Sequence, residues 1–397
     1  MAYSWVVGTA TEPLTGDSAL HKMARKHDVA SVIDLVNAIH VNLTNNRFET
    51  PLIAAAQSGA HACIPTLLSF GADVHYRDRL GNTALHYGVM TNGEKVVEAL
   101  ITANADCNIP NHEGKSALHF VVDSGNTRIA NLLAMTHCPF NFDIKNEADE
   151  DPFVYALNKG NSRMVRYFLA IGYNPSLLTC NGSSPMHLAM PSRDISILRA
   201  VTRKFPVDIK NQNGHTPLAL AILNGNETAI DILWRRQADH TVVDNDGNSL
   251  LHLACKGKSQ SIIVQLLKNT VDINARNKES ETALHIACAV GHSLTILNLC
   301  IAKPDVTIQD DDVRNALMIA VMYGHPDIAL MILDWPFLDF PVLFEQRDSE
   351  NLTLADYCDK FSAVGVKARM ETIISGSPPT RVAIFNYNSL HQQFVPR

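Results

Sequence analysis

The side chains best suited to chemistry in this 397-residue chain are its 17 histidines and eight cysteines. Histidine serves as a general acid or base and as a metal ligand, and cysteine as a nucleophile or metal ligand. In known metal, redox, phosphate-binding and nucleophile sites these residues occur at typical sequence spacings. The chain contains no H-E-x-x-H, C-x-x-C, G-x-x-x-x-G-K-[ST] or G-x-S-x-G pattern. We therefore expect a protein that is not an enzyme, with no catalytic residue, no cofactor and no metal site.

Six of the histidines instead recur in one sequence context, three residues after a serine or threonine and directly after Leu or Met. These are His21, His86, His119, His187, His252 and His285. Cys255 and Cys288 also share one slot, in Leu-His-Leu-Ala-Cys and Leu-His-Ile-Ala-Cys. Neighbouring packed helices lie about 8–10 Å apart, and a disulfide needs Cα atoms within about 7 Å. We interpret both cysteines as reduced core residues, which favours a reducing intracellular compartment, either the cytoplasm or the nucleus.

The histidines belong to a phrase, Thr282-Ala283-Leu284-His285-Ile286-Ala287, that is repeated along the chain. Its first residue is always Ser, Thr, Asp or Asn, the set that caps helix N-termini. Successive copies start 32 to 38 residues apart, mostly at intervals of 32 or 33. The eleven copies start at Ser18, Thr50, Thr83, Ser116, Asp151, Ser184, Thr216, Ser249, Thr282, Asn315 and Thr353.

Each copy predicts the same series of elements. A short first helix follows the capping residue and usually ends at a glycine. A second helix has apolar residues at helical spacing, as in Val96-Val97-Leu100. An Asx-x-x-Gly turn such as Asp78–Gly81 or Asn211–Gly214 then leads to the next copy. A single helix pair cannot bury its own apolar faces, so the copies must stack on one another.

The period near 33 and the T-P-L-H-x-A core resemble ankyrin repeats, over nearly the whole chain. The resemblance implies an all-α repeat solenoid of stacked helix-turn-helix units joined by β-hairpin loops. It also implies that the motif histidine hydrogen-bonds backbone near the hairpin. We expect an N-terminal segment at 1–17, a repeat array at 18–374 whose last copy is a degenerate cap, and a C-terminal tail at 375–397.

The composition of the chain excludes some classes of partner. The net charge of −7 argues against nucleic acid, and no apolar run is long enough to span a membrane. The N-terminus has no charged region of the kind that precedes a secretory signal. The function we expect is a non-catalytic, monomeric scaffold that binds a protein partner. The alternative is a regulatory subunit or substrate-recognition adaptor that delivers a target to an enzyme.

The resemblance implies that the partner binds a concave surface of hairpin tips and first helices. On this chain that surface comprises Arg77, Arg79, Leu80, Asn82, Met90, His112, Lys115, Gln212, His215, Asn245, Asn248, Lys278, Glu281, Asp311, Arg314 and Tyr323. Some ankyrin repeats are also hydroxylated on the asparagine of an L-x5-[DE]-φ-N pattern. Asn108 and Asn274 fit that pattern, which makes them candidate hydroxylation sites.

Three further features stand out from the repeat. Two of them have two possible interpretations each, and the third marks an irregular region. The aromatic segment 335–344 could pack against the C-terminal cap or serve as an exposed docking element. Basic residues in four successive second helices could complement helix dipoles or bind an acidic partner. We also expect an irregular stack around 145–210, where the interval lengthens to 35 residues and Met190-Pro191 replaces the usual glycine.

Overall fold

A computed structural model describes residues 15–135, 140–173, 182–257, 260–268, 271–335 and 340–375. The predicted tail beyond Ser375 and most of the predicted N-terminal segment lie outside these residues. Over the described residues the backbone forms 23 helices, so the all-α prediction is confirmed. Extended pairing there is limited to two isolated bridges, Gln309 with Asn315 and Arg347 with Thr353. The expected β-hairpins are therefore tight turns with almost no strand.

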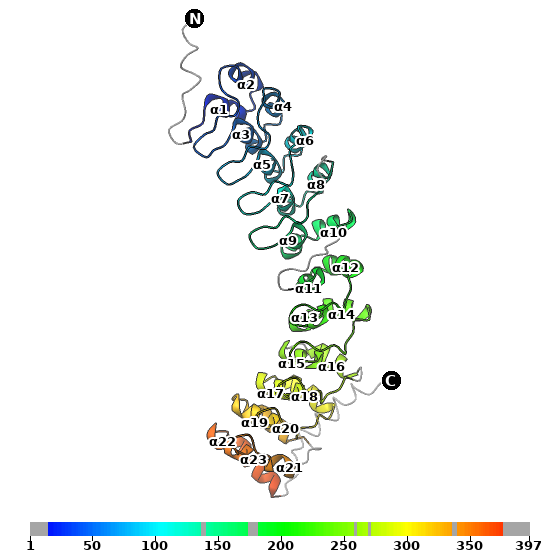
Figure 1. The fold of residues 1–397 in the computed structure, drawn as a ribbon. Helices are drawn as coiled ribbons and strands as arrows, with labels where there is room; N and C mark the ends of the chain where they lie inside the picture. The colour runs from blue at the N-terminus through cyan, green and yellow to red at the C-terminus, as the bar shows by residue number, and fades with distance from the viewer. Residues whose placement is uncertain are drawn as a thin grey trace. The chain divides into compact units, whose positions relative to one another are not determined.

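The chain divides into two compact units, up to Cys180 and from Asn181. In the N-terminal unit the first helices form one layer and the second helices another (Figure 1). The first helices are α1 (Ala19–Arg25), α3 (Pro51–Ser58), α5 (Ala84–Met90), α7 (Ala117–Ser124) and α9 (Pro152–Asn158). The second helices are α2 (Val29–Val36), α4 (Cys63–Ser69), α6 (Glu94–Thr102), α8 (Thr127–Ala134) and α10 (Ser162–Ala170).

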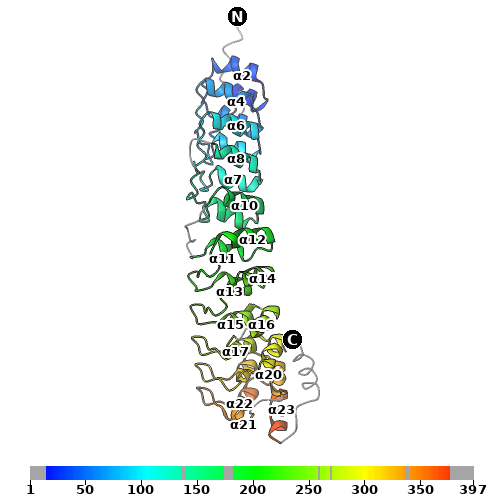
Figure 2. The same ribbon diagram turned by 90° about the vertical axis from the view of Figure 1, so that its right-hand side faces the viewer.

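The C-terminal unit repeats this arrangement, and its helices follow one another in order along the unit (Figure 2). Its first helices are α11 (Pro185–Ala189), α13 (Pro217–Leu223), α15 (Leu250–Gly257), α17 (Ala283–Val290), α19 (Ala316–Met322) and α22 (Leu354–Lys360). Its second helices are α12 (Ile195–Lys204), α14 (Glu227–Arg235), α16 (Gln260–Lys268), α18 (Ser293–Ile301), α20 (Pro326–Leu333) and α23 (Val364–Ile374). One further short helix, α21 (Phe340–Glu345), comes before the last pair.

The first helices begin where the capping residues predict. The Thr50 hydroxyl accepts the N–H of Ile53 at 3.3 Å, and the Asp151 carboxylate accepts the N–H of Val154 at 2.8 Å. Proline occupies the first helical position in α3 and α9, where its missing N–H has no partner to lose. These interactions are local in sequence, which is why a short phrase can specify each helix start.

The core consists of the apolar side chains between stacked helix pairs. Leu52, Leu85 and Leu118 occupy the third position of three successive copies, and each is at most 1% exposed. Phe153 takes that position in the fifth copy and stacks on Tyr173 with ring centroids 4.7 Å apart. The Tyr173 hydroxyl donates to the Asp151 carboxylate at 2.6 Å, so this copy is held by an aromatic contact and a phenol rather than by a histidine.

The Ser184 copy is locally irregular, as its sequence predicts. Helix α11 has five residues, whereas the other first helices have seven or eight. Met190, at the position where other copies end in glycine, is fully buried. Cys255 and Cys288 are buried and free of disulfides, as expected.

The aromatic segment contains buried residues. Trp335 is 3% exposed and Leu343, within α21, is fully buried. Residues 336–339 lie outside the described residues. The buried positions favour packing against the cap over an exposed docking element. No described helix is both long and apolar enough to cross a membrane.

Candidate functional site

The six motif histidines each tie one repeat to the next. In the first copy, His21 Nδ1 accepts the backbone N–H of Ser18 at 3.3 Å, and Nε2 donates to the carbonyl of Glu49 at 2.8 Å. The same pair of bonds recurs at the other five, whose Nε2 atoms reach the residue just before the next cap. The acceptors are the carbonyls of Lys115, Glu150, His215, Glu281 and Arg314 for His86, His119, His187, His252 and His285.

Burial also fixes the charge state of these histidines. Desolvation lowers the pKa of His86 to about 4 and lowers the pKa of the other five. A neutral imidazole with one donor and one acceptor is what the two hydrogen bonds require. Their chemistry is therefore used within the scaffold. Across the described ranges no group of three His, Cys, Asp or Glu side chains is arranged to hold a metal ion.

The residues before each cap form a five-residue finger. The fingers that the structure describes in full are 45–49, 78–82, 111–115, 146–150, 211–215, 244–248, 277–281, 310–314 and 348–352. In the second of these, the Asp78 carboxylate accepts the N–H groups of Leu80 and Asn82, both at 2.9 Å. Neighbouring tips are joined by backbone bonds, such as Arg79 N–H to the carbonyl of Arg47 at 3.1 Å. These bonds hold the finger backbone in place before any partner binds.

The residue two before each cap has a left-handed backbone conformation. It is glycine in most copies, for example Gly81 at φ 78° and Gly114 at φ 74°. Phe48 at φ 57° and Val313 at φ 62° occupy the same position without being glycine. A side chain there costs about 1–2 kcal/mol. Phe48 is nevertheless 55% exposed and Val313 is 39% exposed, so neither repays that cost by burial. Asp149, Ser280 and Asn351 have a positive φ at the same position, so the conformation belongs to the finger and not to these two residues alone.

Several predicted partner-binding residues do lie exposed on fingers or at the ends of first helices. In the N-terminal unit, Leu80 is 61% exposed, Met90 is 48% exposed, and Arg77, Arg79 and His112 are also exposed. In the C-terminal unit the exposed residues are Gln212, Asn245, Lys278, Asp311 and Tyr323, the last at 57%.

Two predicted residues are wrong as contact residues, because they are buried. Asn82 is 3% exposed and its amide oxygen accepts from the Asn111 amide at 3.0 Å. Asn248 is 2% exposed and accepts from the Asn277 amide, also at 3.0 Å. Both side chains link one finger to the next and cannot reach a partner.

Other predicted residues are partly engaged within the chain. The Arg77 guanidinium donates to the carbonyls of Gly81 at 3.2 Å and Pro110 at 2.9 Å. Lys115 pairs with Glu113 at 2.7 Å. His215 Nε2 lies 3.4 Å from the Asp244 carboxylate. These side chains shape the fingers as well as presenting charge.

Three more predicted residues of the C-terminal unit are engaged in the same way. The Asn245 amide donates to the carbonyl of Gln212 at 2.6 Å, and the Glu281 carboxylate accepts from the Asn277 amide at 2.9 Å. Arg314 is half-buried and ion-paired to Asp310 at 2.8 Å. Of these, Arg314 is the least available to a partner, because its charge offsets a nearly buried carboxylate.

The sequence interpretation missed Arg47 and Phe48, which are both exposed. The signal was present, since they lie three and two residues before the Thr50 cap and so belong to a finger tip. The bond from Arg79 N–H to the Arg47 carbonyl brings the two tips together. We call Arg47, Phe48, Arg79 and Leu80 the fingertip patch. No described carboxylate lies within ion-pair distance of either arginine, so the patch combines two free cations with two exposed apolar side chains.

The two candidate hydroxylation sites have similar surroundings in different units. The Asn108 amide oxygen accepts the N–H of Asn141 at 2.9 Å, and that of Asn274 accepts the N–H of Asp305 at 2.9 Å. Both residues are half-buried.

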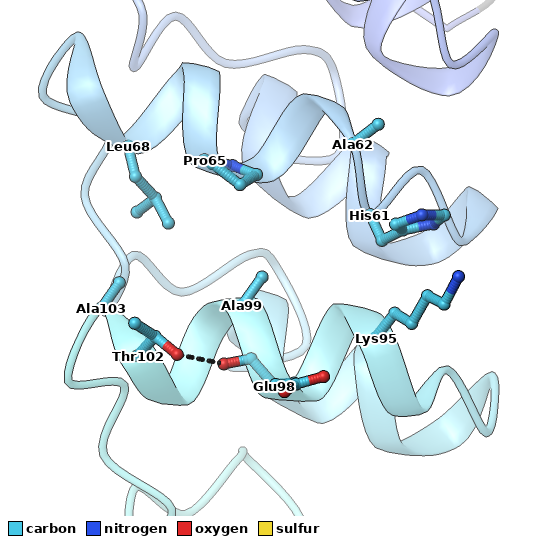
Figure 3. A pocket seen from close by; sticks show the side chains of 9 residues that line it. All are labelled: His61, Ala62, Pro65, Leu68, Lys95, Glu98, Ala99, Thr102 and Ala103. Atoms are coloured by element: carbon cyan, nitrogen blue, oxygen red, sulfur yellow. Dashed lines mark hydrogen bonds between the residues drawn. The ribbon is translucent and has the colours of Figure 1, made fainter.

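A groove of about 640 Å³ runs between the second helices α4 and α6 (Figure 3). Short side chains from both helices, including Ala62, Pro65 and Ala99, leave this space open. At one end of the groove, the Thr102 hydroxyl donates a hydrogen bond to the Glu98 carbonyl of the same helix at 2.8 Å. The groove is mainly apolar, and His61, Lys95 and Glu98 are the titratable side chains that line it.

Comparison with known proteins identifies the repeat. A family model described as Ankyrin repeats (3 copies) matches residues 20–111, 70–144, 118–205, 193–277 and 251–339. Human inversin is 26% identical over 191 residues, which are 46% of this chain and 18% of inversin. The B-cell lymphoma 3 protein homolog of Mus musculus is 29% identical over 107 residues, 26% of this chain and 24% of that protein.

A plant protein shares a shorter stretch. The protein named Probable E3 ubiquitin-protein ligase XBOS32, from Oryza sativa subsp. japonica, is 36% identical over 77 residues, 19% of this chain and 15% of that protein. The chain thus spans at most 24% of the length of these three relatives.

Proposed function

Because the chain belongs to the ankyrin repeat family, whose repeats generally mediate protein–protein interaction, we propose that it is a non-catalytic scaffold for a protein partner. The partner is bound by finger tips and the exposed ends of first helices. One observation carries this proposal: the fingertip patch presents Phe48, Leu80 and two arginines that nothing described in the chain covers or neutralises. Proteins of this family are typically non-enzymatic.

The physical argument is preorganisation. The finger backbone is already hydrogen-bonded, through the Asp78 carboxylate and the bonds between neighbouring tips. A partner that contacts the tips therefore has little loop entropy to remove, which favours binding. Arginine and aromatic side chains are enriched where interfaces are strongest. Phe48 and Arg47 on one finger, with Arg79 and Leu80 on the next, supply that combination.

The chemistry of the patch defines the partner segment. Two free guanidinium groups favour carboxylates, which can accept paired hydrogen bonds from them. The exposed Phe48 ring and Leu80 side chain favour apolar residues between those carboxylates. A segment with acidic and apolar side chains in alternation fits the fingertip patch best.

The patch can be tested by replacing all four residues together, as Arg47→Ser, Phe48→Gly, Arg79→Ser and Leu80→Ser. Phe48→Gly also relieves the left-handed strain, so we expect the fold to keep its stability within about 1 kcal/mol. Partner capture from native lysate should fall at least about tenfold, because two hot-spot residue types are removed. Quantitative mass spectrometry of captured proteins and a thermal melt measure the two effects.

The matched control changes two cations and two exposed apolar residues on second helices of the same unit. Ile33→Ser, Lys95→Ser, Met135→Ser and Arg163→Ser should leave capture unchanged. Equal losses in both variants, or no loss in either, would rule out the fingertip patch as the binding surface.

An adaptor role is the second candidate, and one relative favours it. The rice relative is named as a probable ubiquitin-protein ligase, so repeats similar to these occur within an enzyme. The same capture experiment separates the two roles. A scaffold loses its partner in the fingertip variant, whereas an adaptor loses its target and retains a second, enzymatic partner.

Hydroxylation of Asn108 and Asn274 stays a prediction. Since each amide oxygen is held by a backbone N–H of the next repeat, modification at Cβ would leave that bond in place. Peptide mass spectrometry of protein from native cells should show +16 Da on both asparagines and none after Asn108→Gln and Asn274→Gln. Unmodified peptides at both sites would contradict the prediction.

A further inference from the structure

Basic residues form a ladder on three successive second helices of the C-terminal unit. Arg203, Arg235 and Lys268 each lie 19 residues after the cap of their own repeat, and Lys204 and Arg236 lie 20 residues after it. Helices α12, α14 and α16, which carry them, follow one another along the unit, and α14 packs against both neighbours (Figure 2). We call these five residues the basic ladder, and all five are exposed.

Helix dipoles do not explain why the cations are confined to these helices. A cation in the last turn stabilises any helix. Yet α4, α6, α8, α10, α18 and α20 have no basic residue in that turn, although they occupy the same place in their repeats. Within the described second helices the last-turn cations are restricted to α12, α14 and α16. A general stabilising device would be spread along the chain, so this clustering calls for a local cause.

The charge of four of the five ladder residues is also not neutralised within the described parts of the chain. Arg203, Lys204, Arg235 and Arg236 have no described carboxylate within ion-pair distance, whereas Arg314 and Arg369 pair with aspartates. The chain as a whole carries a net charge of −7. An acidic ligand would therefore be repelled by much of the surface and drawn to the ladder, which gives the ladder selectivity as well as attraction.

The spacing of the ladder indicates the form of the ligand. Packed neighbouring helices lie about 8–10 Å apart, so successive rungs repeat at about that distance. Residues seven apart on an α-helix lie on one face, and about 10.5 Å apart along the axis. On a strand, residues of one face repeat at about 6.7 Å or 13 Å, which does not match. A nucleic acid would meet the unfavourable net charge outside the ladder.

We propose that the basic ladder binds an acidic α-helix of a partner protein, with carboxylates seven residues apart facing Arg203, Arg235 and Lys268. The helix lies across α12, α14 and α16, and Lys204 and Arg236 contact its flanking carboxylates. This surface is separate from the fingertip patch, which lies on fingers of the N-terminal unit. The protein would then have a second binding surface that recognises charge at a fixed period.

Two synthetic peptides test the spacing with the full chain. Both are helical, alanine-rich and fluorescent, and each has three glutamates. In the first the glutamates are seven residues apart and share one face, and in the second they are five residues apart and lie on different faces. Fluorescence anisotropy at low salt should show the first peptide binding about tenfold more tightly.

Substitutions in the ladder test its residues. Each exposed ion pair changes affinity about threefold, so Arg203→Ser, Arg235→Ser and Lys268→Ser together should weaken binding of the first peptide about 30-fold. Arg203→Lys with Arg235→Lys keeps the charge and should retain binding within about threefold. Lys26→Ser, Lys95→Ser and Arg128→Ser remove as many exposed cations elsewhere and should leave binding unchanged.

Three outcomes would overturn the proposal. Equal affinity for both peptides would mean that the basic ladder attracts glutamates whatever their spacing. An equal loss in the ladder variant and in the control variant would place the binding elsewhere. Tighter binding of a short DNA duplex than of the first peptide, abolished by the ladder variant, would make the ligand a nucleic acid.

Discussion

Acidification from pH 7 to pH 5 should destabilise the protein by several kcal/mol while its carboxylates are still charged. The pKa of His86 is lowered by burial to about 4, against about 6.5 in an unfolded chain. Between these two pKa values, His86 is therefore protonated in the unfolded state and neutral in the folded state. Stability is complete above about pH 6.5 and falls as the pH drops from there toward 4. For His86 alone the loss at pH 5 is about 2 kcal/mol.

The other five motif histidines act in the same direction, and they are divided between the two units. His21 and His119 lie with His86 in the N-terminal unit, and the pKa of each is lowered by burial. Protonation of Nδ1 removes the acceptor that holds the backbone N–H of the cap within each repeat, whereas the Nε2 donor that reaches the next repeat is kept. Both units should accordingly be acid-sensitive.

Urea titrations followed by circular dichroism at pH 7.5, 6.5, 5.5 and 5.0 measure this dependence. Carboxylates affect stability in a different pH range. The hydrogen bond from the backbone N–H of Thr353 lowers the pKa of Asp356, so this carboxylate changes the stability only at more acidic pH. The variant His86→Gln should flatten the slope between pH 6.5 and 5. An unfolding midpoint that does not move between pH 7.5 and 5 would show that the motif histidines titrate normally in the folded state.

Replacement of Arg314 by glutamate should destabilise the C-terminal unit by about 3 kcal/mol. The Arg314 guanidinium pairs with Asp310 at 2.8 Å and with Asp312 at 2.7 Å. The Asp310 side chain is only 2% exposed, so its charge is held in place largely by this partner. Reversal would set a third carboxylate beside two others. The free energy of unfolding in urea measures the loss.

Lys278→Glu is the matched control for this substitution. Lys278 also lies on a finger of the C-terminal unit, but it is exposed and has no ion pair with a described carboxylate. Its reversal should change stability by no more than about 0.5 kcal/mol. If the two variants were equally stable, the pair between Arg314 and Asp310 would have no structural weight. Arg314 was predicted to contact a partner. Because its replacement is expected to destabilise the fold, a loss of partner binding in an Arg314 variant would not identify a contact residue.

The repeat and its elements could be predicted from sequence because their causes are local. The cap at Thr50 and the N–H of Ile53 are three residues apart, and the buried Leu52 could be predicted from the apolar residue that recurs at its position in successive copies. The role of His285 could also be anticipated from the resemblance, and its bond to the Arg314 carbonyl confirms it. The burial of Trp335 and Leu343 depended on contacts that the period does not encode.

The helix starts and the lack of familiar catalytic patterns could be inferred from the amino-acid sequence alone, since each depends on residues that are close together in the chain. Which finger side chains are free for a partner depends instead on how the repeats pack. Asn82 accepts a hydrogen bond from Asn111 of the next finger, whereas Arg79 and Phe48 stay exposed. The reason is geometric: stacking brings together side chains about one repeat apart, and a pattern read within one copy cannot show which of them meet.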